Sequence, residues 1–171
     1  IVAEHLLGYK DNHDIFTVVV QVAAIAAVVW YYRRDLWNRT LGLFKRDTAA
    51  IRFWTILVIG CVPAGLIGLL LDKHMEAITK PSVVAVSLIV GGIILWLVDR
   101  GPVRKHNDPV DLADITTKQA ALVGLGQSLA IVPGVSRSGA TIVSGLATGL
   151  NRPTATAFSF YLSIPIMVAA S

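Results

Sequence analysis

The sequence contains few charged residues. Only 15% of its 171 residues are Asp, Glu, Lys or Arg, against about 25% in a typical soluble domain. Hydrophobic residues make up 54%, and a soluble domain of this length buries only about two-thirds of its surface, which is too little to hide them. The composition argues against a soluble enzyme, a disordered tail and a nucleic-acid-binding module, so no nucleic-acid partner is expected.

Cysteine and acidic residues are also scarce. Cys61 is the single cysteine, so no internal disulfide bond can form. Asp and Glu are both absent from Ile115 to the end of the sequence. The formal net charge is +4, and in so apolar a chain these basic residues fit loops that face an anionic membrane surface.

Three long apolar runs predict membrane-spanning helices. They cover about residues 15–32, 53–71 and 83–98. At 1.5 Å per residue each is long enough, or nearly so, to cross a hydrocarbon core of about 30 Å. The alternative is a soluble bundle of buried helices, which the lack of any polar face disfavours. Six basic residues lie between the first two runs and two between the second and third, so the first loop is predicted to be cytoplasmic.

Residues 118–150 show a different pattern. Two apolar segments, 120–132 and 140–150, flank a break at Pro133 and Gly134 and a polar Ser-Arg-Ser-Gly sequence. Neither segment can span a bilayer alone, so we predict a re-entrant helical hairpin. One kinked span is the alternative, but it would be too long and would place Arg137 at its centre. Residues 155–171 begin a further span. The prediction is an all-α, polytopic membrane protein whose 171 residues form a single domain.

The polar sequence between the two halves predicts an anion-binding site. An unpaired guanidinium at membrane depth costs at least about 2.5 kcal/mol, so Arg137 needs a partner. Ser138 opens a helix whose first N–H groups lack partners inside the helix, and nearby hydroxyl groups add donors. A guanidinium fork, hydroxyls and a helix N-terminus together suit a phosphate or pyrophosphate. The alternative is that Arg137 pairs with a carboxylate of another helix.

The same residues resemble a known motif. The sequence has a Gln followed by Pro-Gly-x-Ser-Arg-Ser-Gly-x-Thr, which is similar to the second signature motif of the bacterial undecaprenyl-diphosphate phosphatases, also called bacitracin-resistance proteins. The matching positions are Gln127, Pro133, Gly134, Ser136, Arg137, Ser138, Gly139 and Thr141. Similar residues continue upstream and downstream, for example Phe158-Ser159-Phe160, so the resemblance covers nearly the whole chain.

The resemblance implies a function and a location. It implies hydrolysis of undecaprenyl diphosphate to undecaprenyl phosphate and inorganic phosphate, which recycles the lipid carrier of cell-wall synthesis, in the bacterial inner (plasma) membrane. It also implies one half of an inverted-repeat architecture. The expected partners are the polyprenyl diphosphate and membrane lipids, and a homodimer is left open. A transporter or flippase of anionic lipids is the alternative, because broken helices and inverted repeats are typical of transporters as well.

The resemblance also assigns roles to the motif residues. Arg137, Ser136 and Ser138 are expected to be catalytic, and Gln127, Gly134, Gly139 and Thr141 to bind the substrate. A divalent cation, Mg²⁺ or Ca²⁺, is implied too, but no metal ligand is assigned in this chain. Two acids usual in the family are replaced, by Thr17 and Ala157.

The family carries a first motif, rich in Glu and ending in Ser-Ser-x-Gly-His, which has no counterpart here. We therefore expect a central fragment that lacks this motif and the C-terminal spans, and that is inactive alone.

Weaker signals receive structural interpretations. The histidines at positions 13, 74 and 106 are expected to be solvated loop residues, and His5 to lie at the outer interface. Asp108, Asp111 and Asp114 precede a predicted helix start. The Gly65/Gly68 and Gly91/Gly92 pairs are expected to allow close helix packing.

Overall fold

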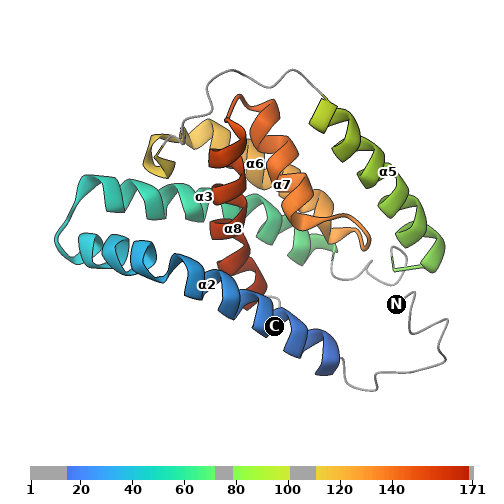
Figure 1. The fold of residues 1–171 in the computed structure, drawn as a ribbon, viewed down its shortest axis with the longest axis horizontal. Coiled ribbons are helices and arrows are strands. Elements are labelled where there is room, and N and C mark those ends of the chain that lie inside the picture. Colours follow the sequence, from blue (N-terminus) through green and yellow to red (C-terminus); the bar gives the residue numbers. More distant parts are fainter. Residues whose placement is uncertain (1–14, 72–78, 101–110, 170–171) are drawn as a thin grey trace.

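The computed structural model describes residues 15–71, 79–100 and 111–169, and every regular element within these ranges is helical (Figure 1). This confirms the predicted all-α class for the described part of the chain. The elements, in chain order, are α2 (Ile15–Phe44), α3 (Thr48–Leu71), α5 (Pro81–Arg100), η2 (Leu112–Asp114), α6 (Thr117–Gln127), η3 (Ser128–Ile131), α7 (Arg137–Ala147) and α8 (Arg152–Ala169).

Helices α3 and α5 are long and apolar enough to cross a membrane. They extend the predicted runs 53–71 and 83–98 by a few residues. Pro63 lies inside α3, and the helix continues through it. The described part of α8 begins just before the predicted span 155–171, with Asn151 accepting a hydrogen bond of 2.8 Å from the N–H of Thr154.

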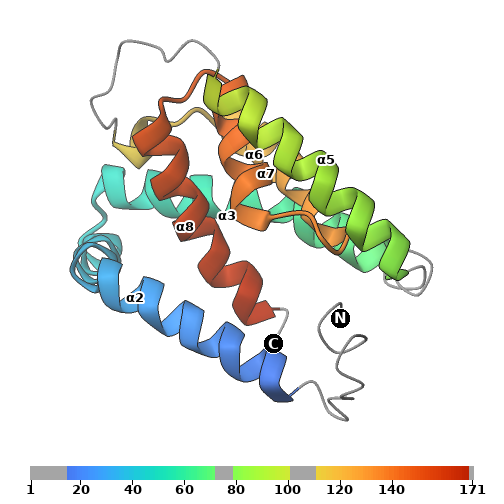
Figure 2. The ribbon, with the colours of Figure 1, turned by 45° about the vertical axis from the view of Figure 1, so that its right-hand side comes forward.

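Helix α2 is longer than its apolar run. It has 30 residues, or about 45 Å, and so continues well past the predicted end at residue 32. Hydropathy marks where apolar residues stop, but the residues that follow include no Pro and are compatible with a helix. In Figure 2 the light-blue end of α2 is seen nearly end-on and the darker blue part from the side, so the helix bends. Side chains bond to the carbonyl groups of Trp30 and Leu36 within it, and such bonds compete with the helical ladder.

Helix α3 lies at the centre of the described bundle (Figure 1). It crosses α6 where two glycines meet, because a Cβ atom added at Gly124 would overlap the carbonyl oxygen of Gly60. Gly60 also faces Phe158 and Leu162 of α8. The backbones of α3 and α6 can approach this closely only because Gly124 lacks a side chain, and the missing side chain of Gly60 leaves room for α8.

The glycines singled out in the sequence do not make such contacts. A Cβ atom added at Gly65, Gly91 or Gly92 would meet nothing within 4 Å, and one at Gly68 would only touch Ile131 at 4.0 Å. Within the described residues the expectation of close packing at these pairs was therefore wrong.

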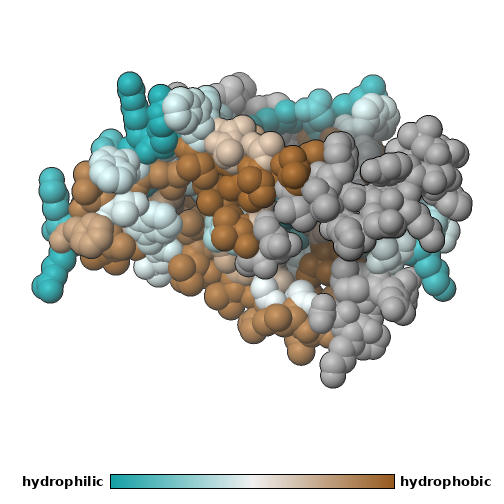
Figure 3. Space-filling model, turned by 90° about the horizontal axis from the view of Figure 1, so that it is seen from below, coloured by the Kyte–Doolittle hydropathy of each residue, from teal (hydrophilic) through white to brown (hydrophobic). Residues whose placement is uncertain are grey.

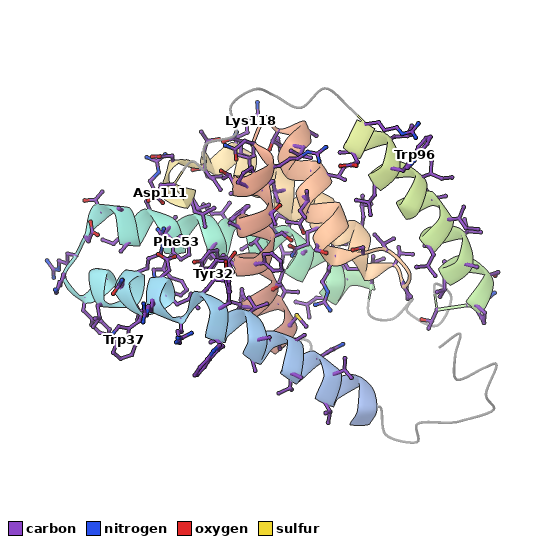
Figure 4. The ribbon with its side chains drawn as sticks, viewed as in Figure 1. Tyr32, Trp37, Phe53, Trp96, Asp111 and Lys118 are labelled. Carbon is purple, nitrogen blue, oxygen red and sulfur yellow. The ribbon has the colours of Figure 1, made fainter. Side chains whose placement is uncertain are left out.

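A polar cluster joins α2 to α3, η2 and α8. Arg39 donates from Nε to Asp35 at 2.8 Å and lies 3.3 Å from a carboxylate oxygen of Asp111. Its guanidinium stacks 4.3 Å from the ring centre of Phe53. The hydroxyl of Tyr161 donates to Asp35, and the Phe53 and Tyr161 rings meet edge to face. Figure 4 shows Phe53 between α2 and α3, with Asp111 on the other side of the N-terminal half of α3.

Helix α5 is held mainly at its two ends. Val84 is its one buried residue, and near its C-terminus Asp99 accepts a hydrogen bond of 2.6 Å from Arg152 of α8. Most of the remaining apolar side chains of α5 are exposed in the described structure, and Val83 and Val98 are half-buried. They have the composition of a surface that faces lipid or another protein segment.

Candidate anion-binding site

Helices α6 and α7 form an antiparallel hairpin. Thr116 caps α6 by accepting a hydrogen bond of 3.2 Å from the N–H of Gln119, and the Gln119 side chain accepts one of 3.0 Å in return. The amide of Gln119 also donates to the carbonyl of Thr148, at 3.2 Å. The start of α6 therefore lies beside the end of α7. The chain turns back between them, as Figure 1 shows in yellow and orange, and does not continue as one kinked helix.

The turn of the hairpin packs against α5. Gly134 has a φ of +95°, a backbone conformation that residues with a side chain rarely adopt. A Cβ atom added there would also lie 2.6 Å from the carbonyl oxygen of Val84. Glycine is thus required at this position on two grounds. The α5 wall, including Val84 and Ser87, was not anticipated, because nothing in the local sequence links these segments.

Helix α7 begins with the polar sequence of the motif. Ser136 is its N-cap, and its hydroxyl accepts a hydrogen bond of 3.1 Å from the N–H of Gly139. The hydroxyl of Ser138 lies 3.3 Å from that of Ser136. Both serines are exposed. The N–H groups of Arg137 and Ser138 have no partner in the described structure, so they can donate to an anion at the positive end of the helix.

The guanidinium of Arg137 has no side-chain partner in the described part of the chain. It is half-buried, and no ion pair or hydrogen bond joins it to another side chain within residues 15–71, 79–100 and 111–169. The described carboxylates near arginines are used elsewhere, since Asp99 pairs with Arg152 and two others pair with Arg39. Pairing with a carboxylate, the alternative raised by the sequence, is not seen in the described part.

Gln127 and Thr141 lie deeper in the hairpin. The Thr141 hydroxyl is 3.1 Å from Oε1 of Gln127 and 2.8 Å from the carbonyl oxygen of Arg137. Thr141 is 1% exposed and Gln127 4%. Nε2 of Gln127 is buried and makes no hydrogen bond to the described residues. The two side chains connect α6 to the first turn of α7. Their predicted contact with substrate remains a prediction.

The seven predicted site residues thus gather at one end of the hairpin. Ser136, Arg137, Ser138 and Gly139 form the first turn of α7, Gly134 shapes the loop before it, and the Gln127–Thr141 pair lies behind it. Two exposed hydroxyls, N–H groups without a described partner and one half-buried guanidinium can together bind a phosphate through charge-assisted hydrogen bonds.

The described residues do not fit a divalent cation. No group of three His, Cys, Asp or Glu side chains comes together within them. Asp111 is engaged as the N-cap of η2, where it accepts a hydrogen bond of 2.9 Å from the N–H of Ala113. The four histidines and Asp108 lie outside the described residues.

Comparisons with known proteins agree with the motif. The family profile described as "Bacitracin resistance protein BacA" matches residues 1–171. A protein of Novosphingobium aromaticivorans named undecaprenyl-diphosphatase is 42% identical over 174 residues, which cover 100% of this chain and 63% of that protein. One of the same name from Acinetobacter baumannii is 42% identical over 98% of this chain and 61% of its own length. A third, from Neisseria gonorrhoeae, is 40% identical over 100% of this chain and 63% of its own.

The chain therefore spans slightly less than two-thirds of the length of these relatives. The family match extends over every residue and includes the whole motif around Arg137. On this evidence the chain belongs to the bacitracin resistance protein BacA family.

Proposed function

We propose that the protein hydrolyses undecaprenyl diphosphate to undecaprenyl phosphate and inorganic phosphate in the bacterial inner membrane. The observation that carries the proposal is the guanidinium of Arg137 at the start of α7, which pairs with no described side chain and lies between two exposed serines in the sequence. The relatives named undecaprenyl-diphosphatase support the same reaction. Hydrolysis would recycle the lipid carrier of cell-wall synthesis.

The hairpin residues would act on the terminal phosphate. A water oxygen bonds to the terminal phosphorus, and the bond from that phosphorus to the bridging oxygen breaks. Arg137 would hold two phosphate oxygens through its planar fork, and Ser138 and the free N–H groups would donate to the charge that develops. Residues 115–169 contain no carboxylate, so the general acid and base would come from elsewhere in the protein. The divalent cation stays a prediction, and none of these steps uses it.

The hairpin would lie in the membrane as a re-entrant segment. Its 3₁₀ end at Ile131 faces Gly68 near the end of α3, and its loop faces Val84 near the start of α5. Both of those helix ends adjoin the loop that the distribution of basic residues places outside. The turn would therefore sit in the outer half of the bilayer, enclosed by protein on the α5 side, as irregular backbone at that depth requires.

Phosphate release and lipid movement separate the two candidate functions. The intact protein, reconstituted in vesicles with undecaprenyl diphosphate, should release inorganic phosphate in proportion to the amount of folded protein. Release should depend on Arg137, so it is compared in the Arg137→Ala and Arg52→Ala variants. Arg52→Ala is the matched control, because Arg52 is exposed and lies in another part of the chain. Transfer of the intact diphosphate across the vesicle membrane without phosphate release would instead support the transporter alternative.

A further inference from the structure

The end of α2 has an exposed apolar stripe. The side chains of Trp37, Leu41 and Phe44 are 66%, 41% and 82% exposed. Their spacing of four and three residues places them on one face of the helix. They follow the predicted membrane span and lie next to a cluster of basic residues. This pattern is typical of a helix that rests in the headgroup region of a membrane.

A shallow pocket lies at the start of this stripe. It has a volume of about 430 Å³ and is lined by Arg33, Arg34, Trp37 and Asn38. Residues 33 and 37, and residues 34 and 38, are each one helical turn apart, so the four side chains form two adjacent pairs. Figure 4 shows Trp37 pointing away from the bundle. The pocket thus opens outward, away from the packed core.

The two arginines of the pocket are available to an anion. Arg33 is fixed by a hydrogen bond of 2.6 Å to the carbonyl of Trp30 and by stacking 4.3 Å from that ring. Arg34 is exposed and makes no ion pair or side-chain hydrogen bond with the residues that the structure describes. Asp35 does not neutralise them, because its carboxylate bonds to Arg39 and Tyr161.

The surface around the pocket favours a lipid over a free ion. Figure 3 shows the face that includes the underside of α2, where brown apolar surface meets teal and pale side chains toward the end shared by α2 and α3. A free phosphate would gain nothing from the exposed ring of Trp37. A phospholipid would place its phosphate on the arginines and its glycerol and upper acyl chain on this ring and the apolar stripe.

We propose that Arg33, Arg34, Trp37 and Asn38 bind the phosphodiester headgroup of an anionic phospholipid. This site lies near the α2–α3 turn, at the opposite side of the molecule from the hairpin turn (Figure 1). It depends on the membrane placement proposed above but not on the hydrolytic activity. The lipid anchors the cytoplasmic end of α2 at the depth where its apolar run stops.

Native mass spectrometry of the intact protein in detergent tests the proposal with phosphatidylglycerol as the probe. Each arginine near the headgroups contributes about a fivefold gain in affinity. The Arg33→Gln/Arg34→Gln double variant should therefore bind phosphatidylglycerol about 25-fold more weakly. The matched control, Lys45→Gln/Arg52→Gln, removes the same charge from exposed positions outside the pocket and should lose no more than about threefold. Trp37→Ala should weaken binding severalfold, and phosphatidylcholine should bind poorly to every form.

Three results would overturn the site. Equal losses in both double variants would mean diffuse attraction to the basic surface. Displacement of the lipid by millimolar inorganic phosphate would mean a simple anion site. Asn38→Asp provides a second test, because it keeps the helix and adds a negative charge, and unchanged lipid binding would also contradict the proposal. Phosphate release in detergent should be unchanged in the pocket variants, so a failure here is separate from a failure of the proposed hydrolysis.

Discussion

Two arginines, Arg39 and Arg137, lie in opposite settings. Arg39 bonds to two carboxylates and stacks on Phe53, whereas no described side chain pairs with Arg137. Both are partly buried. The hydrogen bonds of Arg39 raise its pKa even though burial acts in the opposite direction.

The difference separates a structural role from a binding role. The partners of Arg39 come from α2 and from the segment before η2, so its contacts are used to hold elements together. The neighbours of Arg137 are hydroxyl and N–H donors, which add to its positive potential. A positive site without a partner among the described residues can be neutralised by a bound anion.

The largest expected effect is on catalysis at Arg137. Two charge-assisted hydrogen bonds are worth roughly 1.5 to 3 kcal/mol each, so Arg137→Ala should lower phosphate release about a thousandfold at 1.4 kcal/mol per decade. Arg137→Lys keeps the charge but loses the fork, and a tenfold or larger loss is expected. Activity is measured per amount of folded protein. Near-normal turnover of Arg137→Ala would show that the guanidinium is an ion-pair partner after all.

The packing of α6 against α3 can be disrupted by a substitution that leaves both Arg39 and Arg137 unchanged. Gly124→Ala would force its methyl group into the backbone of Gly60 and should lower the free energy of unfolding by about 3 kcal/mol. Gly91→Ala is the matched control, because a Cβ atom there meets nothing within 4 Å in the described structure. The measurement is the thermal midpoint in detergent. Equal midpoints for the two variants would mean that α3 and α6 do not cross as described.

Removing Arg39 should lower stability and leave activity nearly unchanged, whereas removing Arg137 should lower activity. Arg39→Ala leaves Asp35 and Asp111 without their cation and exposes the ring of Phe53. Because both carboxylates are partly exposed, we expect a loss of only about 1 to 2 kcal/mol in unfolding free energy. The thermal midpoint should fall by a few degrees, while phosphate release per folded molecule stays close to normal. A large loss of activity with no change in midpoint would place Arg39 in the reaction instead.

The smallest effect concerns Asp111 and pH. The hydrogen bond from the N–H of Ala113 holds the pKa of Asp111 below its ordinary value of 3.8, and the charge and hydrogen bond of Arg39 lower it further. Its stabilising contribution is therefore complete above pH 3.8 and is lost as the pH falls through the lowered value. The carboxylate is 53% exposed, so less than about 1 kcal/mol is at stake. Asp111→Asn should weaken the dependence of the unfolding free energy on pH below pH 4. The same pH dependence in the variant and the unsubstituted protein would mean that Asp111 does not cause it.

Much of the fold could be predicted from the sequence because its signals are local. The apolar runs located α3 and α5, and Pro133 with Gly134 located the turn of the hairpin. The start of α7 was predicted slightly too late, at Ser138, whereas Ser136 is the N-cap and Arg137 the first helical residue, as the preference of Ser for N-cap positions allows. The length of α2 was missed, because an apolar run reports membrane contact and not helix continuity.

Contacts between distant segments could not be predicted in the same way. Gly65, Gly68, Gly91 and Gly92 looked as suited to close packing as Gly60 and Gly124, and only the crossing of α3 and α6 distinguishes them. The cluster around Arg39 likewise joins residues 72 positions apart. Local sequence patterns do not indicate which of several similar residues will meet in the folded protein.

The sequence by itself determined the helical class, the break in the hairpin and the chemistry of the Ser-Arg-Ser-Gly turn, because helix periodicity, Pro-Gly turns and functional groups belong to neighbouring residues. The tertiary structure alone decided that Arg39 is paired and that Arg137 has no described partner. It also decided that the hairpin turn rests against α5. The physical reason is that the partners of a charge are set by which helices cross, and crossing depends on backbone approach at positions far apart in the chain.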